Sequence, residues 1–178
     1  MSRTLQAQRE AAPTVAPASQ SEQRSLKRAF GAYPTGVTVV TTMLGEVPLG
    51  FTANSFTSVS IDPPLLLVCH GASASSHAIF REAEGFAVNV LSADQADLAL
   101  RFASRIEDRF EGTAWRTGRG GPILRGTAAW LDCAMHEVHE AGDHSILIGR
   151  VLAHETSERT PLLYSRGQFL PCPGPASG

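Results

Sequence analysis

Residues 49–70 read LGFTANSFTSVSIDPPLLLVCH, and the predicted fold of the whole chain follows from them. The runs Val37 to Thr42 and Leu65 to Val68 are rich in aliphatic and β-branched residues, which favours buried strands. The probable strand between them carries a small donor or acceptor at nearly every step, more than one strand ladder requires. We predict that it is the wall of a ligand-binding site, with the polar residues Thr52, Asn54, Ser55, Thr57, Ser58 and Ser60.

Length and composition favour one globular domain. The chain has 178 residues, 43% of them hydrophobic, which is enough for one core but cramped for two. The net charge of −2 argues against nucleic acid and anionic membranes as partners. Cys69, Cys133 and Cys172 cannot all pair, and the first two lie in apolar runs, so we expect free thiols in a reducing cytoplasm. No export signal or membrane-spanning run is recognisable.

Three segments are predicted along the chain. Residues 1–20 are poor in large apolar side chains and should form a disordered arm, residues 21–170 the domain, and residues 171–178 a flexible tail. Ser19 and Glu22 have the spacing of a capping box, so a helix should begin there. Leu26, Phe30 and Tyr33 share one face of that helix, which we expect to cover one end of a barrel before Pro34 ends it.

The remaining pattern is mainly β. Hairpins are predicted at Leu44–Glu46 and at Glu140–Asp143, strands at 86–91, 127–138 and 145–152, and a short pair near 161–169. Short helices should follow Gly71 and Ser92, the second with Leu98, Leu100, Phe102 and Ile106 on its apolar side. Asp62-Pro63-Pro64 must end a strand, and Gly118 to Gly121 must be a loop. The predicted fold is a closed antiparallel barrel with flanking helices.

Two polar motifs are candidate binding elements. Gly71-Ala-Ser-Ala-Ser-Ser precedes a helix, so free N–H groups and hydroxyls there suit a phosphate, with Arg101 as added charge. Helix capping by Ser73, Ser75 or Ser76 is an equally open interpretation. The turn Gly142-Asp143-His144 places a histidine at the start of a strand. Two interpretations of this histidine are open: a functional group of the site, or a structural residue that flanks the turn.

Several other classes of site are disfavoured. His136 and His139 are three residues apart in a strand pattern and point to opposite faces, so we predict no metal site. No dinucleotide-binding crossover, phosphate-binding loop lysine or nucleophile elbow is present in the sequence. Trp115 and Trp130 are expected in the core or at an edge.

Five motifs taken together resemble the short-chain NAD(P)H:flavin oxidoreductases, the reductase components of two-component flavin monooxygenases. These are FGAYPTGVTVVTT, GFTANSFTSVSIDPPLLLVC, FAVNVLSADQ, the AGDH turn and PLLYSRGQF, which cover about residues 24 to 170. The resemblance implies an FMN-binding split barrel and a homodimer with flavin near the subunit interface. It places flavin contacts on Asn54, Ser55, Cys69, His70, Gly71, Ser75, Ser76, Arg101 and Phe102. Thr52 is a further predicted flavin contact, because it belongs to the polar wall.

The resemblance also implies a nicotinamide side. Its elements would be Pro48, Leu49, Gly50, Phe51 and Thr52, then Gly142, Asp143 and His144, and further Ser165, Arg166, Gly167 and Gln168. In several relatives the position of Ser75 is basic, so phosphate binding here would depend more on the helix end and Arg101.

The expected reaction is hydride transfer from nicotinamide C4 to flavin N5, with His144 orienting a ring and reduced flavin leaving for a flavin-dependent monooxygenase. The sequence does not choose between FMN and FAD, or between NADH and NADPH. Two alternatives stay open: a tightly bound flavin that reduces another acceptor, and a non-catalytic flavin- or haem-binding split barrel.

Overall fold

The computed structural model describes residues 19–170 and 172. The predictions for the N-terminal arm and for most of the C-terminal tail lie outside these residues. The elements in chain order are α1 (Gln20–Gly31), β1 (Thr35–Gly36), β2 (Thr38–Leu44), β3 (Val47–Ala53), β4 (Thr57–Ile61), β5 (Pro64–Gly71), α2 (His77–Glu82), β6 (Gly85–Val90), η1 (Ala93–Gln95), α3 (Ala96–Ala103), β7 (Trp115–Thr117), β8 (Pro122–Leu124), β9 (Ala129–Ala141), β10 (His144–Thr156), β11 (Leu163–Ser165) and β12 (Gln168–Leu170).

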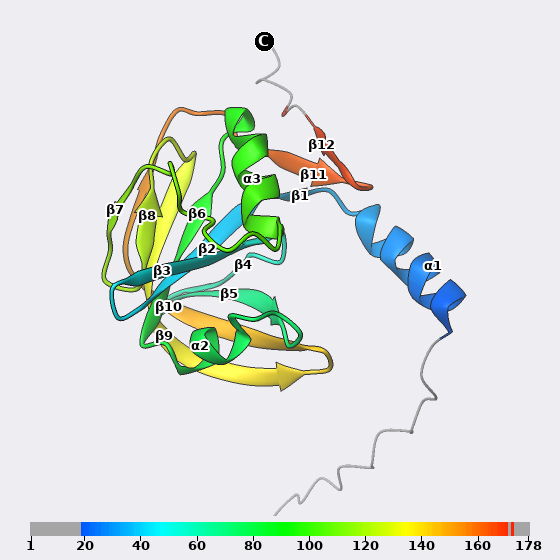
Figure 1. The fold of residues 1–178 in the computed structure, drawn as a ribbon, viewed down its shortest axis with the longest axis horizontal. Coiled ribbons are helices and arrows are strands. Elements are labelled where there is room, and N and C mark those ends of the chain that lie inside the picture. Colours follow the sequence, from blue (N-terminus) through cyan, green and yellow to red (C-terminus); the bar gives the residue numbers. More distant parts are fainter. Residues whose placement is uncertain (1–18, 171, 173–178) are drawn as a thin grey trace, which may run out of the picture.

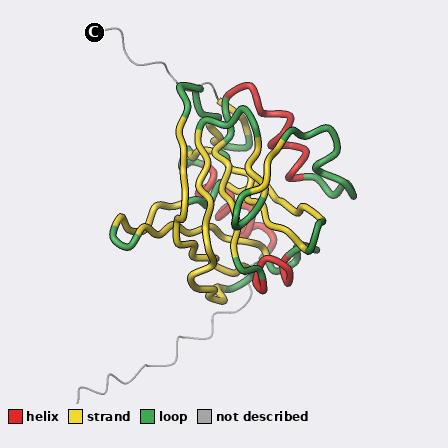
Figure 2. The backbone as a smooth tube through the Cα atoms, turned by 90° about the vertical axis from the view of Figure 1, so that its left-hand side faces the viewer, coloured by secondary structure: helices red, strands yellow, loops and turns green. Residues whose placement is uncertain are grey.

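Seven strands form the body of the molecule. Their order is β3-β2-β6-β9-β10-β5-β4, with antiparallel neighbours throughout. Figure 2 shows these strands as the body, with the helices outside them. β3 lies at one end of the order, yet its Phe51 ring stacks on His70 of β5 with the ring centroids 3.9 Å apart. Side chains therefore close the gap in the sheet, and the mainly β, split-barrel prediction is confirmed.

The predicted hairpins are confirmed and have a local cause. Gly45 joins β2 to β3 and Gly142 joins β9 to β10, and both have positive φ, at 59° and 63°. Tight hairpin turns need such angles, which glycine adopts without steric cost. The strand before Asp62-Pro63-Pro64 ends at Ile61 as predicted, and β5 begins at Pro64.

Two apolar clusters form the core. One lies inside the barrel around Val40, Val68, Phe86 and Leu147. The other packs α3 onto β2, with Phe102 at its centre. Burying a side chain of this kind contributes roughly 1.5–3 kcal/mol, so α3 is held firmly at one end of the barrel (Figure 1).

The prediction for the apolar side of the second helix was partly wrong. The helical segment after Ser92 starts with the 3₁₀ helix η1, which has a capping box formed by Ser92 and Gln95. It continues as α3, which ends at Ala103. Phe102 is buried as predicted, but Leu100 is 59% exposed. Ile106 lies beyond the end of the helix, so helical spacing does not apply to it.

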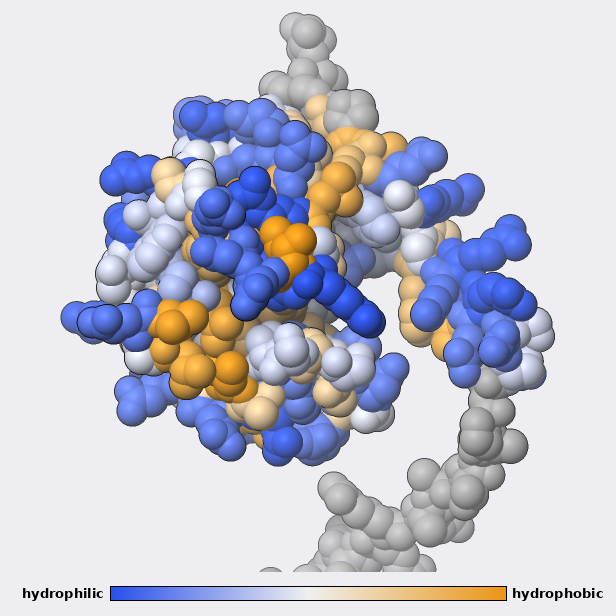
Figure 3. All heavy atoms as spheres, in the orientation of Figure 1, coloured by the Kyte–Doolittle hydropathy of each residue, from blue (hydrophilic) through white to orange (hydrophobic). Residues whose placement is uncertain are grey.

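The expected position of α1 was wrong. Its capping box at Ser19 and Glu22 is present, but the helix buries no residue against the barrel. Leu26, Phe30 and Tyr33 are 52%, 70% and 75% exposed. Figure 3 shows α1 clear of the body for most of its length, because its attachment lies at the C-terminal end, where the Gly31 carbonyl accepts from the Arg166 N–H at 2.7 Å.

Candidate functional site

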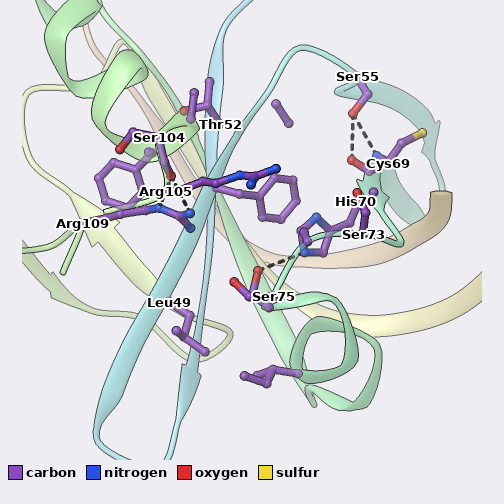
Figure 4. Close-up of a pocket in the computed structure, with 18 of the residues that line it drawn as sticks. Leu49, Thr52, Ser55, Cys69, His70, Ser73, Ser75, Ser104, Arg105 and Arg109 are labelled. Carbon is purple, nitrogen blue, oxygen red and sulfur yellow. Dashed lines mark hydrogen bonds between the residues drawn. The ribbon is translucent and has the colours of Figure 1, made fainter. Parts of the chain in front are cut away.

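A cavity of about 1050 Å³ opens beside the contact between β3 and β5. Its walls come from β3, the residues that follow it, the end of β5, the start of α2, and the loop that follows α3 (Figure 4). The lining residues are Leu49, Phe51, Thr52, Ala53, Asn54, Ser55, Cys69, His70, Gly71, Ser73, Ala74, Ser75, Ser76, Ile79, Phe102, Ala103, Ser104, Arg105, Ile106, Glu107, Arg109 and His144.

One wall is built around His70, which is 2% exposed. Its ring stacks on Phe51 and meets Phe80 edge-on, and its Nε2 lies 3.1 Å from the Ser76 hydroxyl. Burial lowers the pKa of His70 to about 4, and His77, His144 and Arg109 act in the same direction because each disfavours a further positive charge. His70 is therefore a neutral, fixed part of the wall at neutral pH.

The serines at the start of α2 have different roles. Ser76 occupies the N-cap position but makes no capping hydrogen bond, because its hydroxyl lies against His70. Ser73 and Ser75 line the cavity. The capping interpretation is therefore wrong for the hydroxyl of Ser76.

Ser55 joins the two sides of the barrel gap. Its hydroxyl accepts from the Cys69 N–H at 2.9 Å, and it lies 3.4 Å from the Cys69 carbonyl. These contacts take the place of backbone ladder bonds between the loop after β3 and the end of β5. Cys69 is half-buried and Cys133 is buried, and both thiols are free. Burial raises the pKa of Cys133 to about 12.

β3 is held against α3 by two contacts. The Thr52 hydroxyl donates to the Ala99 carbonyl at 2.6 Å. A methyl group at Gly50 would lie 2.8 Å from the Phe102 ring, so this close approach requires glycine. The cavity wall formed by Leu49, Phe51 and Thr52 is thus positioned by the buried face of α3.

His144 lies at the rim of the cavity, at the start of β10 and opposite Gly71 of β5. Its Nδ1 is 2.8 Å from the Asp143 carboxylate, and the hydrogen bond from His144 lowers the pKa of Asp143. An ionised carboxylate can only accept, so Nδ1 carries a proton, and Nε2 of the neutral ring is an acceptor. A methyl group at Gly71 would lie 3.7 Å from this Nε2.

The structure places Arg101 outside the cavity. Its guanidinium donates to the Glu111 carbonyl, and the residue lines a separate cleft of about 270 Å³ on the other side of α3. Helical phase explains this placement, because the neighbouring Phe102 occupies the buried face. Arg105 and Arg109, which no motif in the sequence marks as site residues, line the cavity instead. A signal was available, since they lie in a charged segment directly after the end of α3.

The polar wall is shorter than predicted. The strand pairing stops after Ala53 and resumes in β4, so residues 54–56 turn the chain away from the cavity. Thr57, Ser58 and Ser60 lie on β4, the edge strand of the sheet, and do not line the cavity. The expectation of one continuous strand over residues 52–60 was therefore wrong.

Some predicted nicotinamide-side residues also lie elsewhere. Asp143 contacts the lining residue His144 but does not itself line the cavity, and Pro48 and Gly50 do not line it either. The segment 165–168 forms the β11–β12 turn, where the Ser165 hydroxyl donates to the Gly31 carbonyl of α1 at 3.2 Å. The four residues of this segment all lie outside the cavity lining: Ser165, Arg166, Gly167 and Gln168.

Over the described ranges 19–170 and 172, no three side chains of the metal-binding types gather at one point. His139 lies 2.8 Å from Glu137, and both side chains are exposed. No helix among these residues has the length and apolar character to cross a membrane.

Comparison with known proteins identifies the family. The model of the flavin reductase like domain matches residues 30–172. The chain is 50% identical over 151 residues to stachydrine N-demethylase reductase subunit Stc3 of Rhizobium meliloti, covering 83% of this chain and 65% of that protein. It is 45% identical over 148 residues to the reductase component of the flavin-dependent trigonelline monooxygenase of Acinetobacter baylyi, covering 82% and 48%.

The fold also matches solved structures of flavin reductases. The NADH:FAD oxidoreductase SgcE6 of Streptomyces globisporus, solved with NAD and FAD fragments, superimposes with a TM-score of 0.83 at 40% identity, covering 92% of this chain and all of that one. The chain spans between about half and two thirds of the length of the first curated relatives it matches. The extent of the family match, the sequence identities and the shared barrel show that the chain belongs to the flavin reductase like domain family.

Proposed function

We propose that the protein catalyses the NAD(P)H-dependent reduction of FMN or FAD and releases the reduced flavin. The observation that carries the proposal is the cavity beside β3 and β5, which combines an aromatic wall with hydroxyl and amide groups. The similarity to SgcE6, named as an NADH:FAD oxidoreductase, supports the same activity.

The residues present fit a flavin. A volume of about 1050 Å³ accommodates a three-ring system with a second ring against it. Asn54 and the serines Ser73 and Ser75 offer polar contacts for the flavin, and Phe102 and Ile79 offer apolar contacts. When bound, the flavin supplies the hydride acceptor, and the protein's part is to hold two rings face to face. Phosphate binding by Gly71 to Ser76 remains a prediction.

His144 is proposed to orient the nicotinamide or flavin ring at the rim. Its side chain is 48% exposed, and the bond to Asp143 fixes which nitrogen carries the proton. The free Nε2 can therefore accept a hydrogen bond from a ligand amide without a proton being transferred.

The protein is further proposed to be a homodimer. Leu26 and Phe30 on α1, together with Tyr33 just after it, form an exposed apolar face, and no residue of α1 is buried against the described part of its own chain. A second copy that covers this face would also approach the β11–β12 turn, to which α1 is attached. This would account for the predicted site residues Ser165 to Gln168, which lie away from the cavity of their own chain.

A flavin-dependent monooxygenase component is the proposed partner. One relative is named as the reductase component of a flavin-dependent monooxygenase, and another as the reductase subunit of an N-demethylase. The free thiols of Cys69 and Cys133 support a reducing, cytoplasmic location.

A spectrophotometric matrix tests the activity. NADH and NADPH are each combined with riboflavin, FMN and FAD, and oxidation of the nicotinamide is followed at its absorbance maximum. We expect turnover that depends on added flavin, and protein that loses its yellow colour on dialysis. No nicotinamide oxidation with any flavin would refute the proposal, whereas flavin retained through dialysis would favour a tightly bound cofactor.

A further inference from the structure

The loop from Ser104 to Arg109 forms the cavity wall that faces the serines at the start of α2. Figure 4 shows Arg105 and Arg109 on the α3 side of the cavity, across from Ser73 and Ser75. This loop brings two guanidinium groups and the Glu107 carboxylate to a site that is otherwise lined by uncharged polar and apolar side chains and by histidines.

All three nitrogens of the Arg109 guanidinium make hydrogen bonds that hold the loop. Its Nε and Nη2 donate to the Ser104 carbonyl at 2.9 and 2.6 Å, and its Nη1 donates to the Gly50 carbonyl of β3 at 3.0 Å. Ser104 is the C-cap of α3. One planar guanidinium thus joins the middle of β3 to the end of α3, a geometry that the single ammonium of lysine does not reproduce.

The Arg105 side chain is in the opposite situation. It is exposed, lines the cavity, and makes no hydrogen bond or ion pair with any residue in the described ranges. Among the described residues that line the cavity, one carboxylate, Glu107, is present, and it makes no ion pair with Arg105. An unneutralised cation in a concave site attracts anionic ligands, and a guanidinium matches two oxygens of a phosphate.

We propose that Arg105 binds a phosphate group of the nucleotide in this cavity, and that Arg109 is a positioning residue that holds Arg105 there. The proposal rests on the proposed function, since it concerns the ligands of the same cavity. It replaces Arg101, which the structure places on the other side of α3, as the source of the positive charge.

Direct binding measurements without turnover test the role of Arg105. Dissociation constants of riboflavin, FMN and FAD are measured by fluorescence titration for wild type, Arg105→Ala and Arg101→Ala. A charge-assisted hydrogen bond is worth about 1.5–3 kcal/mol, so Arg105→Ala should weaken FMN and FAD about tenfold or more and leave riboflavin within about twofold. Arg119→Ala is a control for loss of one exposed positive charge, since the side chain of Arg119 does not line the cavity.

A double-mutant cycle tests the positioning role. Arg109→Lys keeps the charge but should lower FMN affinity in the same direction as Arg105→Ala. Because the proposed effect of Arg109 passes through Arg105, Arg109→Lys should have little effect on FMN affinity when Arg105 is already alanine. Independent, additive losses would show that Arg109 acts by general stabilisation, and would overturn its positioning role.

The phosphate can belong to the flavin or to the nicotinamide nucleotide, and a second arm separates them. With riboflavin as acceptor, the KM of NADH is compared with that of reduced nicotinamide riboside, which has no phosphate. An Arg105→Ala effect confined to NADH assigns the phosphate to the hydride donor. Equal binding of all ligands by wild type and Arg105→Ala overturns this proposal alone, whereas a wild type that binds no flavin and oxidises no nicotinamide refutes the proposed function as well.

Discussion

The protonation of His70 makes the stability of the cavity wall depend on pH. Its pKa is lowered from 6.5 to about 4, chiefly by burial, and its ring packs against both Phe51 and Phe80. In the unfolded chain the imidazole takes up a proton near pH 6.5. Between pH 4 and 6.5 the unfolded state therefore binds more protons, and the free energy of unfolding rises with pH over that window.

The size of the effect follows from the pKa difference. Each pKa unit corresponds to about 1.4 kcal/mol, so the full difference is at most about 3 kcal/mol, and about 2 kcal/mol of it should be lost between pH 7 and pH 4.5. Glutamine at this position does not titrate and can still bond to Ser76. His70→Gln should therefore reduce the pH dependence by about 2 kcal/mol, whatever its stability at neutral pH.

Urea unfolding followed by tryptophan fluorescence, at intervals from about pH 4.5 to 7.5, measures this difference. Because the chain has six histidines, the comparison with the variant isolates the contribution of His70. His154→Gln is the matched control, since His154 is exposed on β10 and should keep the wild-type pH dependence. Identical pH dependence in wild type and His70→Gln would refute the argument that burial keeps this ring neutral.

Three further predictions concern other parts of the site. His144→Ala should raise the KM of the nicotinamide or lower kcat while the affinity for oxidised flavin changes little, as steady-state kinetics and flavin titration will show. Gly50→Ala should destabilise the protein by about 1–3 kcal/mol in urea, because the added methyl group lies 2.8 Å from the ring of Phe102, which is 1% exposed. Phe30→Glu should convert the proposed dimer into a monomer in light scattering, because it places a charge on the exposed apolar face of α1.

Each of these variants has a matched control. His154→Ala should leave kinetics unchanged, and equal kinetics for His144→Ala would remove His144 from the site. Gly36→Ala adds the same methyl group where no atom lies within 4 Å, so a similar loss there would contradict the steric argument. Arg24→Glu introduces the same residue elsewhere on α1, and a Phe30→Glu protein of unchanged mass would exclude this face from the interface.

Much of the fold could be predicted because its signals are local. Glycine at the hairpin turns, proline after Ile61 and a capping box at Ser19 each restrict only a few neighbouring torsion angles. The chemistry of the cavity could be predicted as well, because Asn54, Gly71 and Ser75 lie at or shortly after the ends of β3 and β5, and these ends can be located from the sequence.

The amino-acid sequence by itself determined most of the strands, the hairpin turns and the supply of hydroxyl, amide and imidazole groups near the barrel gap. Only the tertiary structure decided which of them face the cavity. Ser58 and Ser60 lie on the edge strand β4, outside the cavity. Arg101 points away from the cavity because Phe102 occupies the buried side of α3. Arg109 lines the cavity, where its guanidinium donates to the Gly50 carbonyl. These outcomes depend on contacts between residues far apart in the chain, such as Gly50 and Arg109, which are 59 positions apart. No local sequence pattern encodes such a contact.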